Sequence, residues 1–355
     1  MGVYCLGGFS IKKIVIFASV IIVLIIGLWF AVIWHSLIYT PLLHGQQKSI
    51  SVKVLPGTGI HALARKLHET GLIHHPRLFI LLAKLTGDAP KMKAGEYQIT
   101  PKMTAPDLLA NIVAGKVMQR SITFIEGWTF RQMRQLLDEN THIKHTITYL
   151  SGAQIMATLG HPEQQYPEGL FFPDTYFFTW GSSDIDVLKQ AYDKMQTILQ
   201  QQWQQRSNDL PYKNAYQALI VASLIEKETA LPQERRLISG VIVRRLKKRM
   251  RLQVDPTVLY GLGRPYGSVI TEGDLALYTP YNTYQRYGLP PTPIDMPSEA
   301  SIIAALHPSP GDALYYVSRG DGSHEFSATY QEHRKAVEKY LQREPANTGS
   351  SNHIR

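Results

Sequence analysis

Two glutamates near the end of an apolar segment are the clearest candidates for acid–base chemistry. The segment AYQALIVASLIEKETA (Ala215–Ala230) predicts a helix that carries Glu226 and Glu228 close to its end. Apolar surroundings disfavour an ionised carboxyl, so such a group can stay protonated at neutral pH and act as a general acid. The chemistry to expect is therefore proton donation to a leaving group.

Helix geometry separates these two carboxyls, because positions two apart are about 200° apart around a helix and cannot both face one cleft. The Glu226 face is small or apolar and is expected to leave room for a substrate; it comprises Leu219, Ala222 and Ser223. The Glu228 face is equally apolar and comprises Val221, Leu224 and Ile225. Periodicity therefore leaves the choice between the two glutamates open. The alternative is that both are helix-end charges, with partners among Lys227, Arg235 and Arg236.

Other common catalytic patterns are missing from the sequence. It has 13 histidines, but no H-E-x-x-H string, and its single cysteine, Cys5, can form neither a cysteine ligand set nor an internal disulfide. No G-x-S-x-G elbow, P-loop or strand-linked G-x-G-x-x-G string occurs. We therefore expect no metal site and no cofactor.

An N-terminal membrane anchor is expected to precede the elements that position these residues. Ile14–Trp34 is apolar without a charge and is long enough to cross a hydrocarbon core of about 30 Å. Lys12 and Lys13 come just before it, and the next lysine or arginine is Lys48. The positive-inside rule then predicts a cytoplasmic N-terminus, residues 1–13 with Cys5, and places everything after Tyr39 outside. A cleaved signal peptide is the alternative, but the apolar run exceeds a typical h-region.

Composition limits the class of protein. The 355 residues are 44% hydrophobic and 18% charged, which is typical of folded domains, and the net charge is +9. A basic chain suits nucleic acid, an anionic membrane surface or an acidic polymer. No RNP-like motif, zinc-finger spacing or long Lys/Arg block supports nucleic acid. The polar residues 343–355 are predicted to be a disordered tail.

Three segments repeat one pattern of a short strand, a turn and an amphipathic helix, and they are Ser51–Glu69, Glu96–Ala114 and Ser121–Glu139. Thr104 and Thr129 are placed to cap the helices that follow them. The apolar helix stripes are marked by Leu63, Ala64 and Leu67, and by Leu108, Leu109 and Ile112. The pattern predicts one or two small α+β domains over residues 49–140.

A larger region follows. It has predicted helices over 184–204, 215–229, 232–250 and 330–342, a strand over 313–317, and a loop-rich stretch over 261–310. The whole chain is thus predicted to be α+β, with a single transmembrane helix over 14–34.

Five strings in this chain are similar to the YceG-like (MltG) family of endolytic murein transglycosylases, and the similarity covers nearly the whole chain. They are EGLFFPDTYFF (168–178), VASLIEKETA (221–230), RLQVDPTVLYGLG (251–263), TPYNTYQRYGLPPTPIDMPSEASIIAALHP (279–308) and LYYVSRGDGSHEFSATYQEH (314–333). The resemblance implies that Glu226, the first Glu of the E-K-E-T string, is catalytic. It also implies a LysM-like module over 49–118 and a catalytic domain over 119–342. One departure is IDMPSEAS, where the family often has an Asn-Pro-Gly-like string, and this puts a loop in doubt rather than the glutamate.

The resemblance further implies the reaction. A lytic transglycosylase cleaves the β-1,4 bond between N-acetylmuramic acid and N-acetylglucosamine without water and leaves a 1,6-anhydro end, so a second protein carboxylate is not required. Polar residues of the similar strings are candidates for holding the sugars, namely Glu168, Gln253, Asp255, Tyr281 and Asn282. Asp255 could instead start a helix, and Glu168 could be a structural ion-pair partner. The aromatic residues of 171–178 could stack on sugars, but a place in the core is the expectation.

The implied role is cleavage of nascent glycan strands at the inner membrane, with a periplasmic catalytic domain, which would terminate strand elongation. Peptidoglycan strands are the expected partner, with peptidoglycan synthases as a further one, and nucleic acid is not expected. Two alternatives stay open: a non-catalytic glycan-binding scaffold of cell-wall synthesis, and a muramidase that uses water.

Overall fold

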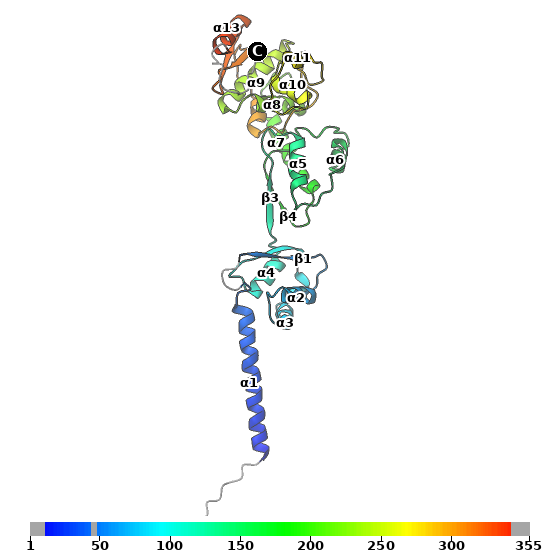
Figure 1. Cartoon of the computed structure of the whole chain (residues 1–355), viewed down its shortest axis with the longest axis vertical. Coiled ribbons are helices and arrows are strands. Elements are labelled where there is room, and N and C mark those ends of the chain that lie inside the picture. Colours follow the sequence, from blue (N-terminus) through cyan, green and yellow to red (C-terminus); the bar gives the residue numbers. More distant parts are fainter. Residues whose placement is uncertain (1–10, 44–47, 342–355) are drawn as a thin grey trace, which may run out of the picture. The chain divides into compact units, whose positions relative to one another are not determined.

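The computed structural model describes residues 11–43 and 48–341, and it divides the chain into two compact units (Figure 1). Unit 1 runs to Arg120 and also includes residues 179–181, and unit 2 comprises 121–178 and the residues from Ser182 onward. Cys5 and the tail 343–355 lie outside the described residues. The mixture of helices and short strands confirms the predicted α+β class.

Unit 1 begins with a long apolar helix, α1 (Ile11–Tyr39), which contains the whole predicted span. It is long and apolar enough to cross a membrane, because its 29 residues extend over roughly 40 Å. Most of its large apolar side chains are exposed along their length. Only near its C-terminal end does Leu37 enter the hydrophobic core of unit 1.

The rest of unit 1 is a two-stranded antiparallel sheet with helices. β1 (Ile50–Val54) pairs with β2 (Gly95–Ile99), with Ile50 opposite Ile99 and Val54 opposite Gly95. Three helices accompany the sheet, two of them between its strands, together with a 3-10 turn: α2 (Ile60–Glu69), α3 (Pro76–Leu85), η1 (Ala89–Lys91) and α4 (Ala105–Ala114). The two predicted apolar stripes are confirmed, since all six of their side chains are buried in one core.

Both predicted helix caps are present. The Thr104 side chain accepts a hydrogen bond from the backbone N–H of Asp107 at the start of α4, and the Asp107 carboxylate accepts one from the Thr104 backbone N–H. Thr129 and Gln132 form the same reciprocal capping box at the start of α5 (Phe130–Glu139). Each box satisfies backbone N–H groups that a helix leaves free at its N-terminus, and it therefore fixes where the helix begins.

Unit 2 is built around the buried helix α8 (Ala215–Glu228), in which every residue from Ala218 to Ile225 is buried. It packs against four helices, α7 (Asp184–Gln204), α9 (Pro232–Lys247), α10 (Asp255–Gly261) and α12 (Glu299–Leu306). The remaining helices are α6 (Gly152–Thr158), α11 (Glu272–Ala276) and α13 (Tyr330–Leu341). Two strand pairs complete the elements: β3 (Gln119–Thr123) with β4 (Thr175–Thr179), and β5 (Tyr315–Ser318) with β6 (His324–Ser327) (Figure 1).

The stretch 261–310 is loop-rich as predicted, although the short helices α11 and α12 lie within it. These helices have five and eight residues, too few to show a clear 3.6-residue period, and their starts are fixed by the caps Thr271 and Ser298. The aromatic run contains the strand β4. Its side chains Phe171, Phe172, Tyr176 and Phe178 are core, as expected, whereas Phe177 points outward and is 60% exposed.

Candidate active site

The Glu226 carboxylate is anchored on one oxygen only. Glu226 lies in the last turn of α8, and its Oε2 accepts hydrogen bonds from the backbone N–H of Ser298 at 3.0 Å and from the Ser298 hydroxyl at 2.6 Å. Ser298 is the N-cap of α12, so the carboxylate also meets the positive end of a second helix. Oε1 makes no hydrogen bond to any residue in the described ranges, which leaves one oxygen for exchange of a proton with a ligand.

The expectation that the small residues behind Glu226 leave room for a substrate is wrong. Leu219, Ala222 and Ser223 are fully buried. The hydroxyl of Ser223 donates to the Ile220 carbonyl at 2.8 Å and accepts from the backbone N–H of Ile294 at 3.1 Å. The segment that leads to Ser298 therefore covers this face, and a substrate must reach the carboxyl from its end rather than along the helix.

A turn at Glu126 and Gly127 borders Glu226. The backbone N–H of Gly127 donates to the Met296 carbonyl, and the N–H of Met296 donates to the Trp128 carbonyl, both at 2.8 Å. Gly127 has a φ of +73°, and a Cβ built on it would lie 3.6 Å from Glu226 Cγ. Burial and then repulsion from Glu226 raise the pKa of the Glu126 carboxyl. Glu126 thus brings a second carboxyl into the electrostatic field of Glu226.

Glu228 faces a different set of residues, as helix geometry predicted. Its side chain hydrogen-bonds Tyr316, and its charge neighbours are Asp255 and Arg245. Burial, followed by repulsion from Asp255, raises the pKa of Glu228 to about 8. No ion pair joins either glutamate of α8 to Lys227, Arg235 or Arg236 within the described part of the chain, so the helix-end ion-pair alternative has no contact to support it.

Two further carboxyls are buried near Glu226. Glu168 accepts hydrogen bonds from the backbone N–H of Phe130 at 2.8 Å and from the Tyr260 hydroxyl at 2.9 Å, and burial raises its pKa to about 7. Asp295 is fully buried, and neither of its carboxyl oxygens has a hydrogen-bond partner. Burial raises the Asp295 pKa well above its ordinary range, against a smaller opposing effect of Lys227. Burial therefore favours the neutral form of Asp295, and a neutral acid can donate a hydrogen bond.

The predicted sugar-holding residues fall into separate places. Glu168 and Tyr281 belong together, because the Tyr260 ring lies between them, hydrogen-bonded to Glu168 and in edge contact with Tyr281 at 4.8 Å. The Tyr281 hydroxyl also lies 2.9 Å from that of Thr292. The Glu168 side chain makes these hydrogen bonds rather than an ion pair with any described residue.

Gln253 and Asp255 lie on the Glu228 side of α8. Gln253 Oε1 accepts a hydrogen bond from Arg245 at 3.3 Å, and the Gln253 backbone has a φ of +51°. Asp255 accepts a hydrogen bond from Tyr284 and is the first residue of α10, as the helix-start alternative expected. The side chains of Gln253 and Asp255 therefore both have hydrogen-bond partners within the fold.

Asn282 is buried and organises the loop around it. Its amide nitrogen donates to three backbone carbonyls, the shortest bond being 2.6 Å to Leu277, and its oxygen accepts from the backbone N–H of Tyr284 at 2.9 Å. These bonds occupy both N–H donors of the side chain. Contact of this residue with a sugar stays a prediction.

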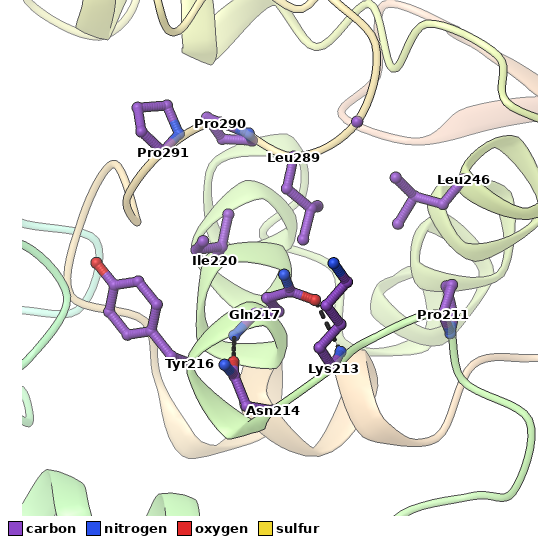
Figure 2. Close-up of a pocket in the computed structure, with 11 residues that line it drawn as sticks. Pro211, Lys213, Asn214, Tyr216, Gln217, Ile220, Leu246, Leu289, Pro290 and Pro291 are labelled. Atoms are coloured by element: carbon purple, nitrogen blue, oxygen red, sulfur yellow. Dashed lines mark hydrogen bonds between the residues drawn. The ribbon is translucent and has the colours of Figure 1, made fainter.

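A cleft of about 440 Å³ lies at the other end of α8 from Glu226 (Figure 2). It is bordered by Asn214, Tyr216 and Gln217 at the helix start and by Leu289, Pro290 and Pro291 of a loop. The side chain of Asn214 accepts from the Gln217 N–H and caps α8, so part of its polar lining is structural. Over residues 11–43 and 48–341, no group of three or more His, Cys, Asp or Glu side chains could hold a metal ion.

Residues 52–339 match the YceG-like family, and the chain therefore belongs to this family. An endolytic murein transglycosylase of Bacillus subtilis is 28% identical, over 88% of this chain and 90% of that protein. One from Streptococcus pneumoniae serotype 2 is 25% identical over 85% of this chain, which spans only 60% of that relative. A crystal structure of a YceG-like protein from Listeria monocytogenes has 27% identity and a TM-score of 0.51, and covers 81% of this chain and 98% of that one.

Sequence reasoning missed four residues that surround Glu226: Glu126, Gly127, Asp295 and Ser298. Glu126 and Gly127 were hidden in the turn of the third strand-turn-helix repeat, where polar residues and glycine are ordinary. Asp295 carried a usable signal, because a lone carboxylate between Ile294 and Met296 is unusual in an apolar string. Ser298 precedes an apolar stretch and matches a helix N-cap, but its second role depends on a contact 72 positions away.

Proposed function

We propose that this protein is an endolytic lytic transglycosylase of peptidoglycan, with Glu226 as its catalytic acid and base. The observation that carries the proposal is the carboxyl of Glu226, which has one oxygen fixed by Ser298 and the other without a hydrogen-bond partner in the described part of the chain. Its family membership and the names of its relatives support the substrate class.

The reaction proceeds in two steps with one carboxyl. Glu226 first gives its proton to the oxygen that leaves C1 of N-acetylmuramic acid, and the β-1,4 bond to N-acetylglucosamine breaks. The carboxylate then accepts the proton of the C6 hydroxyl of the same muramic acid, whose oxygen bonds to C1 and closes the 1,6-anhydro ring. Glu226 ends as it began, protonated, and no water is consumed. The Ser298 hydrogen bonds hold the carboxylate that exists between the two steps.

The supporting parts follow from the same proposal. Helix α1 is the anchor, with residues 1–13 cytoplasmic and the chain after Tyr39 periplasmic, so that Glu226 acts on nascent strands together with peptidoglycan synthases and terminates elongation of these strands. Residues 119–342 are the catalytic domain. Residues 49–118 are a LysM-like glycan-binding module, for which the support is a two-stranded antiparallel sheet with two helices between its strands. A cytoplasm-only reporter fused after Arg343 should be silent, and a strong signal would reverse the orientation.

Glu226→Gln tests the chemistry. Gln keeps an acceptor for Ser298 but cannot donate a proton as a carboxylic acid does, so cleavage should fall by at least about 10²- to 10⁴-fold. Glu228→Gln is the matched control on the same helix and should retain most activity. Mass analysis of digested strands distinguishes the three candidate functions. Anhydro ends support the proposed transglycosylase, reducing ends indicate a hydrolase, and no cleavage by the wild type indicates a scaffold. Equal activity of wild type and Glu226→Gln would refute the assignment.

A further inference from the structure

The ammonium of Lys227 is half-buried beside Glu226 and has no anionic partner. Its side chain makes no hydrogen bond and no ion pair with any residue between 11 and 43 or between 48 and 341. It borders the same point as the catalytic carboxyl, because a Cβ built on Gly127 would lie 3.3 Å from Lys227 Nζ and 3.6 Å from Glu226 Cγ. An ammonium at this point without an anionic partner is available to a ligand that carries an acceptor oxygen.

Tyr266 fixes Lys227 at both ends. The ammonium lies over the Tyr266 ring, 4.7 Å from its centroid, and the Tyr266 hydroxyl donates to the Lys227 carbonyl at 2.5 Å. The hydrogen bond from the Tyr266 hydroxyl satisfies the Lys227 carbonyl, which lies in the last turn of α8 and lacks a partner within the helix. The Tyr266 side chain is nonetheless 57% exposed, so this pair is reached from solvent. A charge held in place and open on one side is prepared for an external ligand.

The nearby carboxyls do not serve as ion-pair partners of this ammonium. The Glu168 carboxyl is used by Phe130 and Tyr260, and Asp295 is held neutral by burial. Lys194, elsewhere in unit 2, has both a ring and an anionic partner. Its ammonium lies over the Phe172 ring, 5.1 Å from the centroid, and forms an ion pair with Asp174. Lys227 lies over the Tyr266 ring in a similar way but forms no ion pair with a carboxylate of the described residues.

We propose that Lys227, clamped by Tyr266, binds the carboxyl-derived oxygen of the lactyl group on the muramic acid next to the scissile bond. This inference rests on the proposed function and deepens it. The two sugars of peptidoglycan differ only by this lactyl ether at C3, which carries a carboxylate when the stem peptide is absent and an amide carbonyl when it is present. The ammonium therefore selects which sugar occupies the position beside Glu226, and with it which of the two alternating β-1,4 bonds is cut.

Binding by full-length protein in detergent micelles tests the proposal. All variants carry Glu226→Gln to prevent turnover, and two probes of equal length are compared: glycan strands stripped of stem peptides, and N-acetylglucosamine oligomers. Lys227→Met should weaken binding of the stripped strands about 10- to 100-fold, as expected for a lost charge-assisted hydrogen bond. Binding of the oligomers should change by less than about twofold. Any contribution of unit 1 to the affinity is the same in every variant, so it cancels when the variants are compared on one probe.

Two matched variants complete the test. Lys227→Arg keeps the charge and should keep the preference for muramic acid, which a purely structural role of the lysine would not require. Lys194→Met removes the other ring-bound ammonium and should alter neither affinity. Equal losses on both probes, or no loss on the stripped strands, would overturn the proposal. Because wild-type cleavage is measured separately, selective binding without cleavage would refute only the proposed reaction, and cleavage without selectivity would refute only this subsite.

Discussion

The buried carboxyl of Glu168 should make the stability of unit 2 depend on pH. Glu168 is only 8% exposed. Burial raises the pKa of its carboxyl more than its two hydrogen bonds lower it, so the pKa rises from 4.5 to about 7. A carboxyl with a folded-state pKa above its unfolded value contributes stability that is fully present below pH 4.5. This contribution is lost as the pH rises through 7.

The size of the effect follows from the two pKa values. At about 1.4 kcal/mol for each pH unit that separates them, the loss approaches about 3 kcal/mol above pH 7. Glu168→Gln cannot ionise, but its amide oxygen can still accept the hydrogen bond from the Phe130 N–H. The difference in unfolding free energy between the variant and the wild type should therefore shift by about 3 kcal/mol in favour of the variant between pH 4 and pH 8.

Urea unfolding followed by tryptophan fluorescence measures this difference on protein that begins at Thr40 and lacks α1. Unfolding curves at several values between pH 4 and pH 8 give the free energy at each. Glu139→Gln, on the exposed side of α5, is the control and should run parallel to the wild type. If the wild-type and Glu168→Gln free energies also run parallel across this range, the carboxyl does not titrate as its burial requires and the reasoning is refuted.

Three further outcomes follow from the contacts around Glu226. Glu228→Gln should lose the same kind of pH dependence over pH 4.5 to 8, since the Glu228 pKa is raised to about 8; an unchanged urea profile would contradict this. Gly127→Ala should lower stability by about 1–2 kcal/mol, seen as a lower thermal midpoint, because φ is +73° and the new Cβ meets Lys227; an unchanged melt would speak against the strain. Ser298→Ala removes the 2.6 Å bond to Glu226, worth about 1.5–3 kcal/mol, and should slow strand cleavage about 10- to 100-fold by mass analysis; wild-type rates would show that the bond is dispensable.

The elements with strong local signals were predicted well from the sequence. The α1 span, the three strand-turn-helix repeats and the caps Thr104 and Thr129 all depend on residues close together in the chain. The short helices α11 and α12 were not predicted, because α11 depends on its cap Thr271, and α12 depends on its cap Ser298 and on packing against α8 and α9, rather than on a periodic pattern. In the loop-rich part of unit 2, tertiary packing therefore determines the secondary structure more than local sequence does.

The candidate site shows the same limit more sharply. The sequence placed Glu226 on a buried helix, but the groups that act on its carboxyl come from far along the chain. Ser298 is 72 positions away and Gly127 is about 100 positions away in the opposite direction. Neither contact has a local signature, since a serine before a helix and a glycine in a turn occur in most proteins. Only the fold brings these residues to one carboxyl.

The same contacts explain why one glutamate of α8 suits acid–base catalysis better than the other. Periodicity gave both faces an equal apolar character, and both carboxyls indeed lie against packed structure. Glu228 is enclosed by Tyr316, Arg245 and Asp255, and its carboxyl is hydrogen-bonded to the Tyr316 side chain. Glu226 instead keeps one oxygen free of described partners, while Ser298 stabilises the carboxylate on the other. A group that must give up a proton and then take one back needs both a stable charged state and an open oxygen, and on this helix only Glu226 combines them.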